Sequence, residues 1–398
     1  MENNKRYLEL KGKKAEEMLY NLAQKTFLTD WCYLNPKLPD NKELCDLLIV
    51  FDNIAIIWQV KDLKIDSDGK YNQSEVKKNL RQLSGAKRQL FDLKTSIQLA
   101  NPKRGKEDFN PKEIKEIYLI SLLMGQQEVF YCPIDTVKKL IVPTFNKESI
   151  KIILNELDTI SDFCKYLKQR EKLFTRKNFE LVVSGGEKEL LAYYLMNEYN
   201  FDSWDKCTGV FLEEGCWNAL KDKPEYKLKQ EENKISYGWD SMIDRAHESN
   251  NPEYEKIARE MAKLSRFERR ILAKSFLEIA LKAHKDIENN VFRRVQNILG
   301  VTYAFLFIDD KTPITQREEA LRTFCYVCRG TFKDNRKVIG IATEKGIKPT
   351  CSYCFGLLDM PEWTEENELQ MKRIQKDTGI LTNPNWKQFQ ENEYPKIS

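Results

Sequence analysis

The stretch LCDLLIVFDNIAIIWQVK, residues 44–61, decides how the first part of the chain folds. Two apolar runs, LLIVF at 47–51 and AIIWQV at 55–60, flank the dipeptide Asp52-Asn53, which is typical of a tight hairpin turn. Both runs are apolar at successive positions, so we expect central strands that are buried on both faces. The stretch therefore predicts a buried β-hairpin.

A two-residue turn also fixes which residues of the hairpin face each other. Phe51 then faces Ile54, and the residue numbers of every cross-strand pair sum to 105. Asp46 is therefore predicted to face Gln59 with Cβ atoms ~5 Å apart, and Lys61 emerges on the same face. Such groups are costly at the end of a buried hairpin unless something ionic binds there. The pattern predicts a site whose oxygen atoms could reach one cation at about 2.1 Å, the distance that Mg²⁺ demands.

The segments around the hairpin complete a mixed α/β core. Residues 13–28 and 74–100 have the apolar periodicity of amphipathic helices, residues 101–112 resemble a loop, and residues 117–123 form another buried run. This order predicts a mixed sheet with flanking helices. We assign it to a first domain, residues 1–135.

One acidic residue of the first predicted helix is a further candidate for the site. At about 100° per residue, Glu16 falls within the apolar arc that holds Ala23 and Phe27, whereas Glu17 falls on the wet face. Glu16 would supply the second negative charge that the amide of Gln59 lacks.

Taken together, GKKAE, LCD and QVK after a hairpin resemble the helix-glutamate, D, QxK variant of the PD-(D/E)XK nucleases, the restriction-endonuclease-like superfamily. The resemblance covers about the first third of the chain and is similar to Mrr-type restriction enzymes. It implies that Asp46 bridges the metal, Gln59 adds a ligand, Lys61 orients or activates water, and Glu16 is the helix carboxylate. Cys45 stands where the name-giving proline would be, and Gln59 replaces an acid.

The resemblance implies a Mg²⁺- or Mn²⁺-dependent endonuclease that hydrolyses phosphodiester bonds, with DNA expected before RNA, in a restriction or anti-phage defence role. The alternative is a non-catalytic nucleic-acid-binding or scaffolding protein on a decayed nuclease fold. An unregulated nuclease would damage its own cell, so we expect a regulatory protein partner, an inhibitor or a trigger. The sequence leaves open whether the enzyme forms a homodimer that cuts both strands.

A basic segment follows the predicted site. Ten Lys and Arg residues lie between residues 70 and 106, with few acidic ones among them. Lys77, Arg81 and Arg88 share one helical face and are predicted to contact nucleic-acid phosphates beside the metal. The alternative is that these basic residues form an ordinary solvent-exposed face of the helix.

The rest of the chain predicts a mostly helical middle region, residues 136–295, and a C-terminal α/β unit, residues 296–398. Helical patterns cover residues 145–174 and 253–285, the second broken near Leu264-Ser265. The C-terminal unit is predicted from a strand, a helix and a strand at residues 301–308, 315–328 and 337–343.

Four cysteines of the C-terminal unit have the spacing of a zinc site, Cys325-x2-Cys328 and Cys351-x2-Cys354. The first pair also continues the apolar pattern of its helix, so ordinary core packing is the alternative. Both interpretations stay open from sequence.

The bulk composition excludes several classes of protein. With a net charge of +4 in 398 residues, the chain as a whole is not strongly basic, so any basic surface must be local. Apolar stretches fall well short of the ~18 residues that suggest a membrane span, and the start resembles no signal peptide. We expect a cytoplasmic protein with reduced thiols and no membrane partner.

Overall fold

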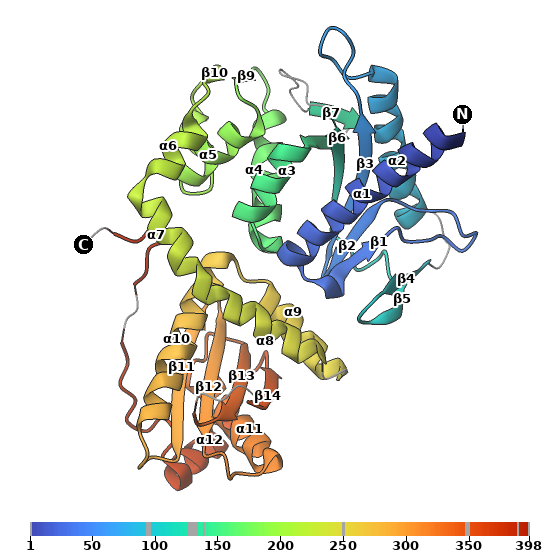
Figure 1. The fold of residues 1–398 in the computed structure, drawn as a ribbon. Coiled ribbons are helices and arrows are strands. Elements are labelled where there is room, and N and C mark those ends of the chain that lie inside the picture. The colour runs from blue at the N-terminus through green and yellow to red at the C-terminus, as the bar shows by residue number, and fades with distance from the viewer. Residues whose placement is uncertain are drawn as a thin grey trace. The chain divides into compact units, whose positions relative to one another are not determined.

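The computed structural model describes residues 2–92, 97–125, 134–137, 140–248, 251–346, 351–387 and 390–396. The chain divides into two compact units, residues 1–223 and 224–398 (Figure 1). The boundaries predicted at residues 135 and 295 fall inside these units, which are described separately below.

A six-stranded mixed sheet forms the centre of the first unit. β3, β6 and β8 run parallel to one another, while β1, β2 and β7 pair antiparallel with their neighbours. The order across the sheet is β1-β2-β3-β6-β8-β7. The strands are β1 (Cys32–Leu34), β2 (Leu47–Phe51), β3 (Ile54–Leu63), β6 (Glu116–Gly125), β7 (Ile134–Val137) and β8 (Leu140–Asn146).

The predicted hairpin is present in the predicted register. Phe51 pairs with Ile54 and Leu47 pairs with Trp58 in the antiparallel β2–β3 ladder. Asp52 takes a left-handed φ of 52°, as a two-residue hairpin turn requires. Most residues of both strands are buried, which confirms that the hairpin is central.

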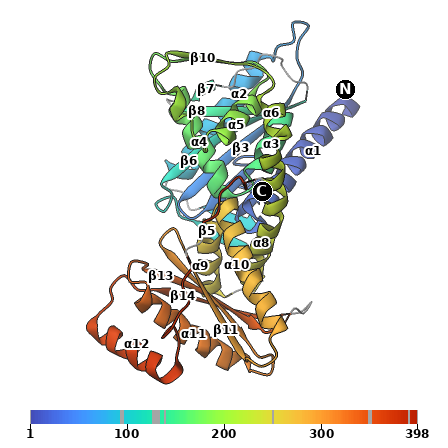
Figure 2. The same cartoon turned by 90° about the vertical axis from the view of Figure 1, so that its left-hand side faces the viewer.

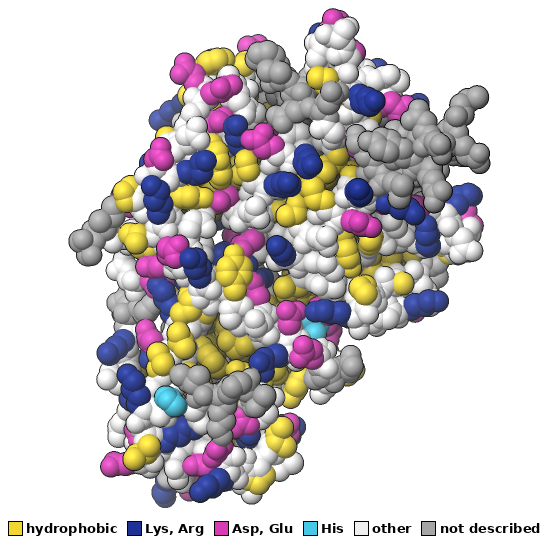
Figure 3. Space-filling view, viewed as in Figure 1, with side chains coloured by type: hydrophobic (Ala, Val, Ile, Leu, Met, Phe, Trp, Pro, Cys, Tyr) yellow, Lys and Arg dark blue, Asp and Glu magenta, His cyan; other side chains and the backbone are white. Residues whose placement is uncertain are grey.

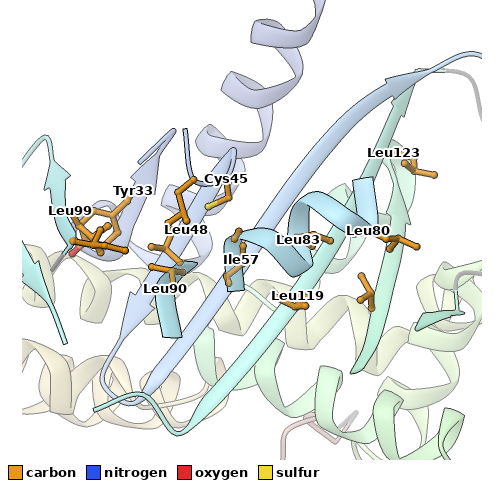
Figure 4. Packing of buried hydrophobic residues seen from close by; sticks show 14 of the residues in the cluster. Tyr33, Cys45, Leu48, Ile57, Leu80, Leu83, Leu90, Leu99, Leu119 and Leu123 are labelled. Carbon is orange, nitrogen blue, oxygen red and sulfur yellow. The ribbon is translucent and has the colours of Figure 1, made fainter. Parts of the chain in front are cut away.

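Helices cover both faces of this sheet. Leu80, Leu83 and Leu90 of α2 (Gln73–Phe91) pack against Leu48 and Ile57 on one face (Figure 4). The other face is covered by the helices α1 (Glu2–Phe27), α3 (Lys147–Glu156) and α4 (Ile160–Phe174), whose ring contacts include Phe27 and Trp58 against Phe163. The sheet is thus held between helices, as the sequence predicted.

The helix predicted over residues 74–100 was wrong in its last third. α2 ends at Phe91, and β4 (Ile97–Asn101) pairs antiparallel with β5 (Gly105–Phe109), which lies inside the predicted loop. The side chains of β4 alternate between buried and exposed, a period of two that marks a strand. Ile97 continues the helical spacing of Leu90 and Leu93 in the sequence, which misled the prediction, whereas Leu99, two residues further on, fits only a strand.

The predicted helix over residues 145–174 is two helices, α3 and α4. Asn146 caps the first by accepting from the Ser149 N–H, and Thr159 caps the second by accepting from the Asp162 N–H. The remaining elements of the unit, which no sequence pattern predicted, are η1 (Thr29–Trp31), β9 (Glu180–Val183), α5 (Glu187–Met196), η2 (Asp202–Trp204), β10 (Gly209–Leu212) and α6 (Cys216–Asp222).

The second unit contains a four-stranded sheet of order β11-β12-β13-β14, in which β12 and β13 are parallel. The predicted strand, helix and strand at 301–343 are confirmed, as is the helical region that breaks near Ser265. The elements are α7 (Pro224–Asn233), η3 (Lys234–Ser236), α8 (Tyr237–Glu248), α9 (Pro252–Ala262), α10 (Arg266–Lys285), β11 (Val291–Ile298), β12 (Val301–Ile308), α11 (Ile314–Thr331), β13 (Lys337–Glu344), β14 (Tyr353–Asp359) and α12 (Glu365–Thr378).

Helices cover both faces of this second sheet (Figure 2), and the side chains of β12 point alternately to the two faces. Tyr303 and Phe305 contact Trp239 of α8, and Phe305 also contacts Phe276 of α10. The intervening residues, such as Leu306, face the cluster that includes α11. Within the described ranges, no helix has the length and apolar character needed to cross a membrane.

Candidate functional site

A pocket of about 660 Å³ opens in the first unit beside the β2–β3 hairpin. All four predicted catalytic residues line it: Glu16, Asp46, Gln59 and Lys61. The other lining residues are Glu43, Leu44, Cys45, Val60, Asp62, Lys64, Gln82, Gly85, Ala86 and Gln89. The structure therefore brings together the side chains that the hairpin register and the helix periodicity placed on a common site.

Asp46 and Gln59 are in direct contact across the hairpin. The Gln59 Nε2 donates a hydrogen bond to Asp46 Oδ2 over 2.7 Å, and the Val60 N–H donates to the same oxygen. The two side chains are 7% and 6% exposed, so the pair is largely withdrawn from water. The predicted facing of these residues is confirmed.

Burial raises the pKa of the Asp46 carboxyl to about 7. The hydrogen bond from the Val60 N–H opposes this rise, the nearby charges of Glu16 and Glu43 add to it, and that of Lys61 opposes it. A carboxyl with this pKa exchanges its proton near neutral pH, and a cation that binds here must first displace that proton.

The affinity of the pocket for a divalent cation should consequently rise with pH. With a pKa near 7, about a tenth of Asp46 is ionised at pH 6 and about nine tenths at pH 8, so the apparent affinity should increase roughly tenfold over this interval and level off above it. Calorimetric titration of Mn²⁺ into the full chain at pH 6, 7 and 8 measures this. Equal affinities at pH 6 and pH 8 would contradict it.

Glu16 is held in place by a residue that the sequence did not single out, Asn35. The Asn35 Nδ2 donates to Glu16 Oε2 over 3.1 Å, and its backbone N–H donates to the carbonyl oxygen of Asp46 over 3.0 Å. Its φ is 47°, a left-handed conformation that asparagine and glycine accept more readily than other residues. Asn35 thus connects the carboxylate of Glu16 to the backbone of Asp46.

Replacement of Asn35 by glycine should separate binding from folding. Asn35→Gly keeps the left-handed backbone but loses the hydrogen bond that orients Glu16, so we expect cation affinity to fall about tenfold with a stability change under about 1 kcal/mol. Titration and thermal melting measure the two effects. The matched control is Asn41→Gly, at an exposed asparagine that also has a positive φ, 64°, outside the pocket; equal losses in both variants would refute the role of Asn35.

Lys61 lies half-buried on the wall of the pocket, and its ammonium makes no hydrogen bond or ion pair with any residue in the described ranges. Its ammonium is therefore available to water or to a ligand. The end of β6 lies close to β3 at Gly125, where a Cβ would collide with the Leu63 carbonyl and with Asp62. The φ of Gly125 is 107°, which also requires glycine.

Helix α2 supplies part of the pocket wall through residues that the sequence did not single out. Gln82, Gly85 and Gln89 line the pocket. The predicted phosphate-binding residues are exposed on α2 but do not line the pocket: Lys77, Arg81 and Arg88. At about 100° per residue they lie roughly a quarter of a turn round the helix from the pocket wall.

Asn79 fastens this helix to the sheet behind the site. Its Nδ2 donates to the Ser121 Oγ over 2.8 Å and to the carbonyl oxygen of Gln59 over 3.3 Å. Asn79 is completely buried, and it fixes the backbone of β3 at the candidate ligand. The sequence did not indicate this role of Asn79, because an asparagine in a helix usually lies at the surface.

The four cysteines with the spacing of a zinc site are not grouped as metal ligands among the described residues, and zinc binding stays a prediction. Cys325, Cys328 and Cys354 are buried in the apolar core of the second unit, and burial raises their pKa values, to about 12 for Cys325. Cys351 lies apart, with its Sγ 3.9 Å from the Gly346 carbonyl oxygen. Core packing, the alternative interpretation, explains the first pair and Cys354.

Across the described residues, no three His, Cys, Asp or Glu side chains are grouped so as to hold a metal ion. A cation in the candidate pocket would therefore rest on the carboxylates of Glu16 and Asp46 together with the amide oxygen of Gln59. On the face seen in Figure 3, basic and acidic side chains are interspersed, in keeping with the small net charge. Compared with family models, with curated proteins and with solved structures, the chain shows no significant match.

Proposed function

We propose that the first unit is a metal-dependent endonuclease that hydrolyses phosphodiester bonds of DNA. One observation carries the proposal: Glu16, Asp46, Gln59 and Lys61 line a single pocket, where the pKa of Asp46 is about 7. Perturbed carboxyls beside an available amine in a concave site are typical of catalytic centres. The sequence resemblance to PD-(D/E)XK nucleases supplies the reaction class and the preference for DNA.

The donor set suits Mg²⁺ or Mn²⁺. Two carboxylates and a carboxamide oxygen are the hard ligands that these cations take in proteins. When bound, such a cation would lower the pKa of its water and offset charge on the phosphate. Glu16, Asp46 and Gln59 would hold the cation. Burial favours the protonated form of Asp46 and so raises its pKa, and a bound cation would replace that proton.

Gln59 must reorient to take part. Its NH₂ group now donates to Asp46, so its Oε1 becomes a ligand only after the amide turns about its last side-chain bond. Release of that hydrogen bond leaves both Asp46 oxygens able to face a cation. Lys61, without an ion pair among the described residues, would hold the attacking water or a phosphate oxygen.

Cleavage assays on several substrates test the proposal. The full chain is incubated with supercoiled plasmid, labelled single-stranded DNA and labelled RNA in Mg²⁺, Mn²⁺ or EDTA. The proposal predicts cutting of DNA that EDTA abolishes. Binding of nucleic acid that survives EDTA without any cutting would instead support the non-catalytic binding or scaffolding protein. Cutting of RNA alone would correct the substrate class.

A further inference from the structure

Helix α2 turns a distinct face to the pocket that holds Asp46 and Lys61. The lining positions Gln82, Gly85 and Gln89 are spaced by three and four residues, which places them on one side of the helix. We call these three residues the α2 wall. The wall carries no charge, whereas the rest of the pocket contains four carboxylates and two amines.

No described residue of the protein explains why position 85 is a glycine. It lies in the middle of a 19-residue helix, where glycine is less favourable than alanine, and its φ is not positive. A Cβ built on Gly85 would meet nothing within 4 Å, so no neighbouring atom requires its absence. Gly330 of α11 is the contrast, because a Cβ there would collide with Met371 and Trp363. A glycine that packing does not require, on a pocket wall, is typical of close approach by a ligand.

The two glutamines of the wall are available to the same ligand. The side-chain amides of Gln82 and Gln89 make no hydrogen bond to any residue in the described part of the chain. They are seven positions apart, or about 10.5 Å along the helix axis, which is roughly the rise of three stacked nucleotides. Amides offer both donors and acceptors, which suits sugar, base and phosphate oxygen atoms alike.

We propose that the α2 wall is the surface against which the nucleic-acid strand lies on either side of the scissile phosphate, with Gly85 letting the strand approach the helix backbone and Gln82 and Gln89 contacting the flanking nucleotides. The inference rests on the proposed nuclease function and adds the contact surface to it. Acidic pocket residues would repel the strand's phosphates, whereas a neutral amide wall accepts the strand without that repulsion.

Graded substitutions at Gly85 test the steric part of the proposal. Binding of a fluorescent DNA oligonucleotide in Mg²⁺ is measured by anisotropy in the Lys61→Met background, which prevents cutting during the measurement. Gly85→Ala should weaken binding a few-fold and Gly85→Leu by roughly tenfold or more, while the melting temperature of each stays equal or rises because both residues favour helix. Ser84→Leu, at the adjacent position outside the pocket, should bind as the parent does.

Substitutions of the glutamines test the polar part. Gln82→Ala and Gln89→Ala should each weaken binding by roughly three- to tenfold through a lost hydrogen bond, whereas Gln73→Ala, at the exposed start of the same helix, should not.

The outcomes separate this inference from the proposed function. If the wild-type chain cuts DNA and Gly85→Leu binds as tightly as the parent, the wall is refuted and the nuclease stands. If the wild-type chain neither binds nor cuts nucleic acid, both are refuted.

Discussion

We expect Asp46→Asn to reduce metal-dependent cleavage strongly and, at the same time, to make the metal-free protein more stable near pH 8. The change removes a carboxylate that would hold the cation, and a bound cation contributes several kcal/mol of charge stabilisation in the transition state. Each 1.36 kcal/mol is a factor of ten in rate, so the rate of cleavage should fall on the order of 10³-fold. The variant keeps the shape of the side chain and an oxygen for the Val60 N–H.

The gain in stability follows from the sign of the pKa shift. The pKa of Asp46 is raised to about 7 in the folded chain, so proton binding favours folding, and that contribution is lost as pH rises from about 4 through 7. At pH 8 the wild type must bury a charge that the variant lacks. The variant should therefore be more stable by on the order of 1–4 kcal/mol at pH 8, and by less at pH 5.

Denaturant unfolding in EDTA at both pH values measures this difference, with Asp68→Asn, at an exposed aspartate, as the control. A variant that is less stable than wild type at pH 8, or that still cuts, would show that Asp46 is a structural residue.

We expect Lys61→Met to reduce cleavage by on the order of 10²- to 10⁴-fold, the usual contribution of a group that transfers or positions a proton. The methionine keeps most of the apolar stem and removes only the ammonium, which makes no ion pair in the described part of the chain. Cation affinity should change little, because lysine has no ligand oxygen. Single-turnover cleavage and Mn²⁺ titration measure the two effects separately.

Lys64→Met is the matched control for this effect. Lys64 lines the same pocket, three residues further along, and the substitution removes the same charge. If loss of positive charge alone mattered, both variants would lose activity equally. We expect Lys64→Met to stay within a few-fold of wild type.

The hairpin and its site could be predicted because local rules fix them. A two-residue turn sets the register of β2 and β3, and strand alternation then places Asp46, Gln59 and Lys61 on one face. Glu16 followed from helix periodicity in the same way. In each case the deciding information lies within one element or one turn.

The missed residues depend on how separate elements come together. Asn35 reaches Glu16 only because the segment before β2 returns past α1, and Gln82 and Gly85 reach the pocket through the rotation of α2 about its axis. No periodic pattern in the sequence indicates where the segment before β2 runs or which face of α2 turns to the pocket. The basic residues of α2 are exposed outside the pocket, and their contact with phosphates stays a prediction.

The most direct test of the account compares cleavage of one labelled DNA duplex by wild type, Asp46→Asn and Lys61→Met in Mg²⁺ and in EDTA, with folding of each variant checked by its melting curve. The account predicts cutting by wild type in Mg²⁺ alone, and cutting slower by on the order of 10²-fold or more in either folded variant. Cutting that persists in EDTA, or that both variants retain, would contradict a metal-dependent site at Asp46 and Lys61.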